Sequence, residues 1–413
     1  MGLSRRNFLT AGAAGVGVLA SGAAGFGLGH ETAAAEPARS KGVEPFYGAH
    51  QAGIATAQQD RLLFATYDLT AANAADVRQL LDEWTAASAR MVAGLDAAPT
   101  AASIASPPAD TGEAIGLDPA HLTITFGFGP GLFERDGDDR YGMAHHRPAA
   151  LVDLPAFAGD SLEPGRSGGD LCVQVCANDP QVAYHAVRNL TRIGRGKAVL
   201  RWTQVGFGRT SSTTPEQETP RNLMGLKDGT NNLRAGEPGF VDDVWVTAAD
   251  GPSWMVNGSY LVARRIRMFI EVWDRSSLED QELTIGRTKL QGAPIGGTAE
   301  RDAIDLGAKG SDGEPRIPAD AHVRLANQQA NGIHLLRRGY SFTDGIDSQT
   351  GQLDAGLFFL AYQRDPRKQF IPLQQRLAGD ALNEYIQHVG SAVFAVPPGV
   401  AAAGQPIGDA LFA

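Results

Sequence analysis

The apolar positions in the first half of the chain show two different spacings. Leu122, Ile124, Phe126 and Phe128 alternate with polar or small residues, which is typical of a strand with one apolar face. Between Val77 and Met91 the apolar residues recur at helical spacing instead. The expected elements are a strand at 62–69, a helix over 77–91, strands at 122–128 and 171–176, a helix at 179–192 and a strand at 198–207. This β-α-β-β-α-β order is the ferredoxin-like plan.

The second half repeats this plan more loosely. The expected elements are a strand at 259–273, a helix at 277–285, strands at 333–338 and 356–363, a helix carrying Leu382, Tyr385, Ile386 and Val389, and a strand at 391–396. The repetition is one of pattern and not of identical residues. We therefore expect an α+β chain of two ferredoxin-like halves with antiparallel sheets, divided into an N-terminal domain at 46–220 and a C-terminal domain at 221–413.

Three long stretches interrupt the plan, at about 95–120, 129–169 and 287–320, and all are rich in Gly, Pro, Ala and Asp. Loops of this length in a compact domain are either functional or disordered. The third stretch leads directly to His322, so we expect it to wall a pocket. The first is low in complexity, which is typical of a mobile surface loop.

The N-terminus carries the pattern of an export signal. Arg5 and Arg6 precede an apolar run from Ala11 to about Gly29, and three alanines at 33–35 offer a cleavage site. The run is rich in Gly and Ala, so it would insert weakly as a membrane anchor. We expect residues 1–35 to be a cleaved twin-arginine signal, and the mature protein to be extracellular, periplasmic or in the cell envelope. This route carries folded cargo, which suits a protein that acquires a cofactor before export.

Charge and hydropathy narrow the classes of partner. The formal charge of the chain is −10, and loss of residues 1–35 would make it −11, because Arg5, Arg6 and Glu31 are removed. An acidic chain without a basic block is poorly suited to nucleic acid, so we expect no such partner. After residue 35 no apolar run is long enough to span a bilayer, so we expect no stable membrane span.

The two cysteines, Cys172 and Cys176, lie four residues apart on an expected strand. At about 3.3 Å per residue they would stand roughly 13 Å apart on one face, which is too far for a disulfide. We therefore expect two buried thiols, and a fold stabilised by its core and by a cofactor.

Two segments about ninety residues apart carry the candidate chemistry. The first, GLKDGT at 225–230, holds Asp228 between glycines; the second, DAHVRLAN at 320–327, holds His322 and is followed by the paired arginines of LLRRGYSF at 335–342. Reaction of peroxide at haem needs an imidazole on the iron, a base that moves a proton between the peroxide oxygens, and a cation that stabilises the developing charge. The two segments together supply all three, although each motif alone is weak.

Asp228 is the expected distal acid–base group. Gly225 and Gly229 on either side of it would let the backbone approach a haem face where a Cβ would collide. The alternative interpretation is a simple turn, because Lys-Asp-Gly-Thr is also good turn chemistry. A carboxylate is a weaker base than imidazole, so we expect such a site to operate best at acid pH.

His322 is the expected iron ligand among nine histidines. Taken alone, each of the others has an ordinary packing or surface explanation, apart from His30, which would leave with the signal. An iron-bound imidazole also needs an acceptor for its other ring N–H. Glu384, on the helix expected after Asp380, is the candidate acceptor, and a surface acid on that helix is the alternative.

Arg338 is the expected distal cation, with Arg337 as the alternative. Adjacent residues of an extended segment point to opposite faces, so only one of the two can face a pocket. We choose Arg338, because Gly339 would let the chain pack tightly directly after it.

Taken in order along nearly the whole mature chain, these segments resemble those of dye-decolourising (DyP-type) haem peroxidases, and in particular the exported subgroup of deferrochelatase/peroxidases. The matching segments are the twin-arginine signal, QDRLLFATYDL at 59–69, HLTITFGFGPGLFE at 121–134, GLKDGTNN at 225–232, DAHVRLAN at 320–327, LLRRGYSF at 335–342, GLFFLAYQRDP at 356–366 and GSAVFAVPPG at 390–399.

The resemblance implies one haem b per chain, held mainly by the second half. It implies His322 as the axial ligand, Asp228 and an arginine of the RRG segment as the distal pair, and Gly229, Thr230 and Arg338 beside the haem. The implied activity is oxidation of dyes, phenols and similar small aromatic donors by H₂O₂ through a high-valent iron-oxo intermediate. The alternative is a deferrochelatase that works with an iron-uptake permease and releases iron from haem with the tetrapyrrole intact. The sequence leaves open whether the chain forms a homo-oligomer.

Overall fold

The computed structural model describes residues 42–99, 104–327 and 331–413. The signal expected at 1–35 lies outside these residues, as does part of the loop expected at 95–120. Residues Arg39–Ala413 make up one compact unit. Both expected halves belong to this unit, and the boundary expected between residues 220 and 221 stays a prediction.

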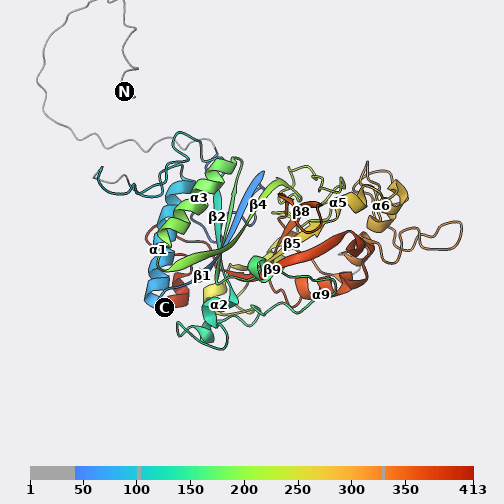
Figure 1. Ribbon diagram of the computed structural model, residues 1–413. Coiled ribbons are helices and arrows are strands. Elements are labelled where there is room, and N and C mark those ends of the chain that lie inside the picture. Colours follow the sequence, from blue (N-terminus) through green and yellow to red (C-terminus); the bar gives the residue numbers. More distant parts are fainter. Residues whose placement is uncertain (1–41, 100–103, 328–330) are drawn as a thin grey trace, which may run out of the picture. The chain divides into compact units, whose positions relative to one another are not determined.

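The first half forms the expected order of strands and helices. Its elements are β1 (Arg61–Leu69), α1 (Ala74–Val92), β2 (Thr123–Phe128), α2 (Pro130–Phe133), β3 (Leu171–Ala177), α3 (Pro180–Ile193) and β4 (Ala198–Arg209) (Figure 1). The side chains of Asn73 and Asp179 accept backbone N–H groups in the first turns of α1 and α3, and Pro180 occupies the first helical position of α3. Apolar positions at helical spacing between Val77 and Met91 predicted α1, and the Asp179-Pro180 pair predicted the start of α3.

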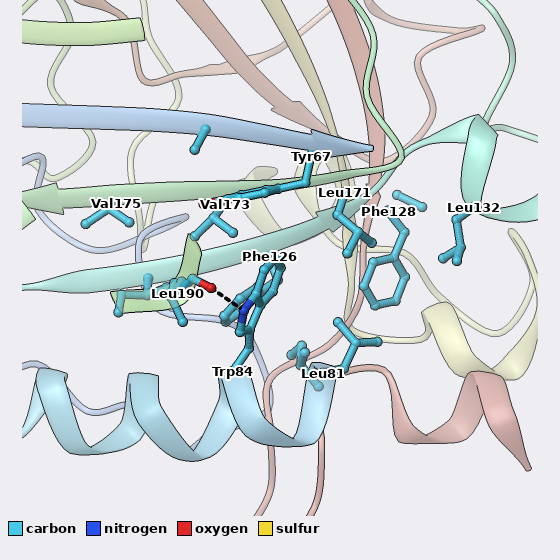
Figure 2. Packing of buried hydrophobic residues seen from close by; sticks show 14 of the residues in the cluster. Tyr67, Leu81, Trp84, Phe126, Phe128, Leu132, Leu171, Val173, Val175 and Leu190 are labelled. Carbon is cyan, nitrogen blue, oxygen red and sulfur yellow. Dashed lines mark hydrogen bonds between the residues drawn. The ribbon is translucent and has the colours of Figure 1, made fainter. Parts of the chain in front are cut away.

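Helices α1 and α3 pack together over the strands of the first half. Trp84 of α1 is fully buried, and its indole N–H donates to the carbonyl oxygen of Leu190 in α3 over 2.8 Å. Figure 2 shows this bond, with the ring of Phe126 from β2 against the indole at a centroid distance of 6.0 Å. The helices thus close one apolar core on the outer face of the strands.

The second half departs from its expected elements at several places. It contains α4 (Phe240–Val244), β5 (Ser259–Met268), α5 (Ile270–Trp273), α6 (Leu278–Ile285), α7 (His322–Leu325), β6 (Leu336–Arg337), β7 (Tyr340–Ile346), β8 (Leu353–Gln363), α9 (Phe370–Arg376) and β9 (Ile386–Val396). The strands expected at 356–363 and 391–396 are confirmed as parts of β8 and β9. The strand expected at 259–273 is wrong beyond Met268, where the chain turns into α5, and the one at 333–338 is reduced to two residues. The sequence did not predict β7.

The helix expected from the apolar positions at 382–389 is also wrong. Residues Ala381–Glu384 form only a short 3-10 segment, and Ile386 already belongs to β9. Strand β9 pairs with β5 along its length, from Met268 opposite Ile386 to Ser259 opposite Val396. A short apolar run is compatible with either period, so pairing with a neighbouring strand decides the outcome. The helix between β8 and β9 is α9 instead.

The described strands form one antiparallel sheet whose ends meet. Its order is β5-β9-β2-β3-β1-β4-β7-β8-β6, and an additional β5–β8 pairing closes the ring. The order β4-β1-β3-β2 in the first half matches β9-β5-β8-β7 in the second, which is the arrangement of a ferredoxin-like unit. The α+β class with two ferredoxin-like halves is therefore confirmed, and short β2–β9 and β4–β7 pairings join the two halves.

The inside of the strand ring is packed with aromatic and aliphatic side chains. Phe64, Trp202, Phe358 and Phe394 belong to one buried cluster there, together with Cys172. Both cysteines are buried and free, as expected. Among the helices of the described residues, none has the length and apolar character needed to cross a bilayer.

Candidate active site

A cavity of about 240 Å³ lies in the second half of the chain. Side chains from β5, β8, β9, α7, α9 and the segment 222–231 line it, and its walls are largely apolar, with Met224, Leu226, Ile266, Leu357, Phe359 and Ile386 among them. Arg287 and Ile304 also line it, so the third long stretch does wall a pocket. Of the site residues expected from the sequence, Asp228, Gly229, Thr230 and His322 line this cavity.

His322 presents its ring to the cavity from the first position of α7. Its Nδ1 lies 2.6 Å from Oδ2 of Asp380, a carboxylate that is almost fully buried. The 32 % of the His322 side chain that stays exposed lies at the cavity wall. A carboxylate acceptor keeps a proton on Nδ1, so Nε2 is the atom available to a metal.

The acceptor expected for this imidazole was the wrong residue. Glu384 is exposed, whereas Asp380 begins the same 3-10 segment and accepts the backbone N–H of Leu382 over 2.8 Å with its other oxygen. Asp380 therefore holds both the segment and the imidazole. The only local signal for it was a Gly-Asp pair at an expected helix start, which is the ordinary pattern of a cap.

The groups around His322 shift the pKa of its imidazole. Burial of the ring disfavours its charged form, but the adjacent Asp380 carboxylate outweighs this effect and raises the pKa of His322 above its usual value. Asp228 raises this pKa further and Arg337 lowers it, so both groups act on the imidazole across the cavity.

Asp228 lies in an irregular segment beside the cavity. Its backbone N–H donates to Pro220 over 2.9 Å. Its carboxylate accepts from Nδ2 of Asn222 over 3.2 Å and from Nη1 of Arg337 over 2.9 Å. The aspartate is thus held in place beside a guanidinium, and both groups line the cavity.

The glycines around Asp228 are also required by the local backbone and packing. Gly229 has φ +91°, and a Cβ there would lie 2.9 Å from the Cα of Ser211. Gly225 has φ +79°, and its Cβ would lie 3.0 Å from the Lys289 side chain. Both positions favour glycine because the backbone is left-handed and a Cβ would crowd protein atoms, and the expected close approach of Gly229 to a haem face stays a prediction.

The arginine that faces the cavity is Arg337, and the expectation that Arg338 does so is wrong. Arg338 is 0 % exposed, and its guanidinium points into the protein, where it donates to the Thr56 carbonyl over 2.5 Å and to the side chain of Gln59. The two arginines do take opposite sides of the extended segment, as expected. Gly339 does not indicate which arginine faces the cavity. A Cβ at this position would lie 2.6 Å from Oγ1 of Thr210, a residue that does not line the cavity.

Asn232 is a site residue that the sequence analysis missed. Its side-chain Oδ1 accepts the backbone N–H of Arg337 over 2.7 Å, and its Nδ2 donates to the Arg337 carbonyl over 2.8 Å. Nδ2 also donates to the Ser212 carbonyl over 3.0 Å. One buried amide therefore fixes the backbone of the arginine that pairs with Asp228. Its only signal was a place within the GLKDGTNN segment.

Two arginines and a second histidine also line the cavity. Arg264, Arg287 and His388 all contribute, and all three are buried. Burial and the neighbouring Arg264 lower the pKa of His388 to about 3, so this ring is neutral near pH 7. Arg264 binds Ser391 over 2.9 Å and also Asp160, while its Nε has no hydrogen-bond partner among the described atoms.

This set of donors fits haem. His322 can offer Nε2 to iron while Asp380 holds its Nδ1, apolar side chains can cover a flat macrocycle, and the buried Arg264 and Arg287 can meet its two carboxylates. Among the described residues, no group of three or more His, Cys, Asp or Glu side chains could hold a metal ion.

Comparisons with known proteins agree with this geometry. Residues 51–208 match a family model described as Dyp-type peroxidase, N-terminal, and residues 219–401 match one described as Dyp-type peroxidase, C-terminal. Deferrochelatase of Escherichia coli K12 is 38% identical over 376 residues, which cover 89% of this chain and 87% of the relative.

Solved structures show the same relationship. A DyP-type peroxidase from Streptomyces coelicolor is 40% identical with a TM-score of 0.81, over 91% of this chain and 99% of that one. Ferric DtpA from Streptomyces lividans gives the same values. A DyP-type peroxidase from Cellulomonas bogoriensis is 39% identical with a TM-score of 0.78, over 89% of this chain and 98% of that one.

Proposed function

We propose that His322 binds the haem iron and that Asp228 and Arg337 act on peroxide. The premise is that this chain belongs to the Dyp-type peroxidase family and is a haem peroxidase. One observation carries this assignment: the paired Asp228 and Arg337 share a largely apolar cavity with an imidazole whose Nδ1 is held by a buried carboxylate. A peroxidase uses H₂O₂ and a reductant, and small phenols and dyes are the reductants that we propose.

Haem supplies the iron centre at which the O–O bond of peroxide is reduced. His322 offers Nε2 to that iron, and the hydrogen bond to Asp380 increases electron donation from the imidazole. The Asp228 carboxylate would take a proton from one oxygen of peroxide and return it to the other. Arg337 stabilises the negative charge that develops during cleavage. Because an ionised carboxylate acts as the base, we expect the reaction to remain fast at acid pH.

The first test is the absorption spectrum of the purified protein before and after one equivalent of H₂O₂ at about pH 5, a pH at which a carboxylate base still works. We expect a Soret band that shifts within milliseconds. A Soret band that does not move would exclude fast peroxide chemistry. A protein without a Soret band, even after haem addition, would overturn the assignment.

A second candidate function is removal of iron from haem. The Escherichia coli relative is named deferrochelatase, and its similarity extends over most of both chains. We propose this as an alternative role of the same cavity, with an iron-uptake permease as the partner. The test is to incubate the haem-loaded protein with a reductant and a ferrous chelator. Appearance of free porphyrin fluorescence together with chelated iron would support this role. Haem that keeps its iron under these conditions would exclude it.

Export by the twin-arginine route is a further proposal. It is supported by Arg5 and Arg6 ahead of an apolar, alanine-rich run. Replacing both arginines with lysine should retain the protein in the cytoplasm of a host that has this translocon. Equal export of both forms, detected by fractionation, would exclude the route.

A further inference from the structure

Glu300 connects the long stretch at 287–320 to the segment that carries Asp228. Its Oε1 accepts the hydroxyl of Thr230 over 3.0 Å, and its Oε2 forms an ion pair with Lys227. Lys227 and Thr230 directly bracket Asp228 and Gly229 in the sequence, and both line the cavity. A single carboxylate therefore holds both ends of the turn on which the proposed acid–base group lies.

The turn depends on such contacts because it belongs to no helix or named strand. Its backbone is anchored by the N–H of Asp228, which donates to Pro220 over 2.9 Å, and by the N–H of Asn222, which donates to Leu226 over 3.0 Å. After Asp228, the N–H of Asn232 donates to the Gly229 carbonyl over 3.0 Å. Side-chain bonds add to these backbone bonds: Asn222 and Arg337 donate to the Asp228 carboxylate itself. Glu300 binds the two residues that bracket the Asp228-Gly229 pair.

Glu300 is itself firmly placed. Nη1 of the buried Arg287 donates to its carbonyl over 2.8 Å and to that of Gly292 over 2.7 Å. The side chain of Glu300 is only 15% exposed. Burial disfavours its charged form, but hydrogen bonds from Lys227 and from threonine hydroxyls outweigh burial and lower its pKa. It therefore stays ionised at the acid pH at which we expect the enzyme to work.

We propose that Glu300 is a positioning residue for Asp228: it binds Lys227 and Thr230 and so holds the aspartate in the cavity beside Arg337, where its carboxylate can exchange a proton with peroxide. This inference rests on the proposed role of Asp228. A small displacement of a reacting group costs a large factor in rate, so loss of this grip should slow the reaction with peroxide although Glu300 itself does not line the cavity.

The test compares Glu300→Gln with Glu314→Gln, the same change at an exposed residue of the same stretch. The haem-loaded proteins are mixed with excess H₂O₂ in a stopped-flow instrument across the acid pH range. For Glu300→Gln we expect a rate constant lowered about tenfold and a changed pH profile, with a wild-type Soret band and haem content. The Glu314 variant should match the wild type. A wild-type rate and pH profile in Glu300→Gln would overturn the proposal.

A double variant separates positioning from an independent effect. If Glu300 acts through Asp228, Glu300→Gln combined with Asp228→Asn should be no slower than Asp228→Asn alone. Losses that multiply would overturn this proposal and leave the role of Asp228 intact. A wild-type rate and profile in Asp228→Asn alone would overturn the role of Asp228, and this proposal with it.

Hydrogen exchange gives a readout that does not depend on turnover. Peptides covering 222–232 should exchange faster in haem-loaded Glu300→Gln than in the wild type or in Glu314→Gln. Lys227→Met breaks the same ion pair from the other side and should accelerate exchange in the same peptides, which keeps the test valid if the glutamate variant folds poorly. Unchanged exchange in both variants would overturn the proposal.

Discussion

The carboxylate of Asp380 lies 2.6 Å from Nδ1 of His322, although 58 residues separate the two in the chain. This contact orients the imidazole, fixes which nitrogen carries the proton, and leaves Nε2 to the cavity. It also ties this imidazole to the start of the segment that leads into β9, because Asp380 accepts the N–H of Leu382. An imidazole supported in this way is a stronger donor to iron than a free one.

Replacement of Asp380 with Asn should therefore weaken haem binding by about 10- to 100-fold, because such supporting residues contribute that much to metal affinity. Haem titration followed at the Soret band measures the change. Glu384→Gln is the matched control and should bind haem like the wild type, because Glu384 is exposed. Equal affinity of the Asp380 variant and the wild type would contradict the role given to this contact.

His322→Ala should lose most of its haem, because it removes the imidazole that we propose as the iron ligand. His334→Ala is the control: His334 also pairs with an aspartate, Asp243 at 2.8 Å, but it does not line the cavity. Haem content per chain after purification distinguishes the two. A normal haem content in His322→Ala would exclude it as the ligand.

The two adjacent arginines should behave differently when each is replaced with leucine. Arg337→Leu should retain haem but react with H₂O₂ about 100-fold more slowly or worse, as expected for loss of a group that stabilises developing charge. Arg338→Leu should keep a near-normal rate in the folded fraction, since this guanidinium lies outside the cavity. Stopped-flow rate constants decide between them, and the reverse result would reinstate Arg338.

Asn232→Ala should impair the site through the backbone of Arg337. Removal of the amide leaves the Arg337 N–H and carbonyl without their partner, and each buried unpaired group costs about 1–3 kcal/mol of stability. We expect a lower unfolding temperature and a slower peroxide reaction, with haem still bound. Neighbouring Leu233→Ala, which removes a buried apolar side chain instead, should destabilise the protein without a comparable loss of rate in the folded fraction.

His388 should make the haem-free protein sensitive to acid. Its pKa is about 3 in the folded state against an ordinary value of 6.5, so the unfolded chain binds this proton first as pH falls. The neutral His388 ring therefore contributes to the free energy of unfolding above pH 6.5, and this contribution is lost as the pH drops toward 3. Between pH 7 and pH 4 the free energy of unfolding should fall by about 3 kcal/mol on this account. Urea unfolding at several pH values should show a smaller acid loss in His388→Asn. The same pH dependence in both proteins would contradict this.

Local signals predicted the first half well. The caps at Asn73 and Asp179 and the alternation in β2 depend on residues close in sequence, so they survive in any tertiary context. In the second half, apolar spacing alone did not distinguish a helix from a strand. The apolar positions at Ile386 and Val389 fit helical spacing, yet they lie in a strand because β5 offers hydrogen-bond partners along its whole length.

The candidate site divides in the same way. Asp228 and His322 could be identified from their own motifs, and both line the cavity. The sequence also established that only one of Arg337 and Arg338 could face it, because the backbone of an extended segment alternates. Which arginine does so depends on the position of Asn232 and Thr210, residues distant in the chain, and Gly339 could not reveal it.

The sequence by itself thus determined the fold class, the family and the chemical types of the site. Only the tertiary structure decided the partners: Asp380 for the imidazole, Arg337 for Asp228, and Glu300 for the turn that carries it. The physical reason is the range of the interactions. Periodicity and capping act within a few residues, whereas the hydrogen bonds that complete this site join segments that come together only when the strand ring closes.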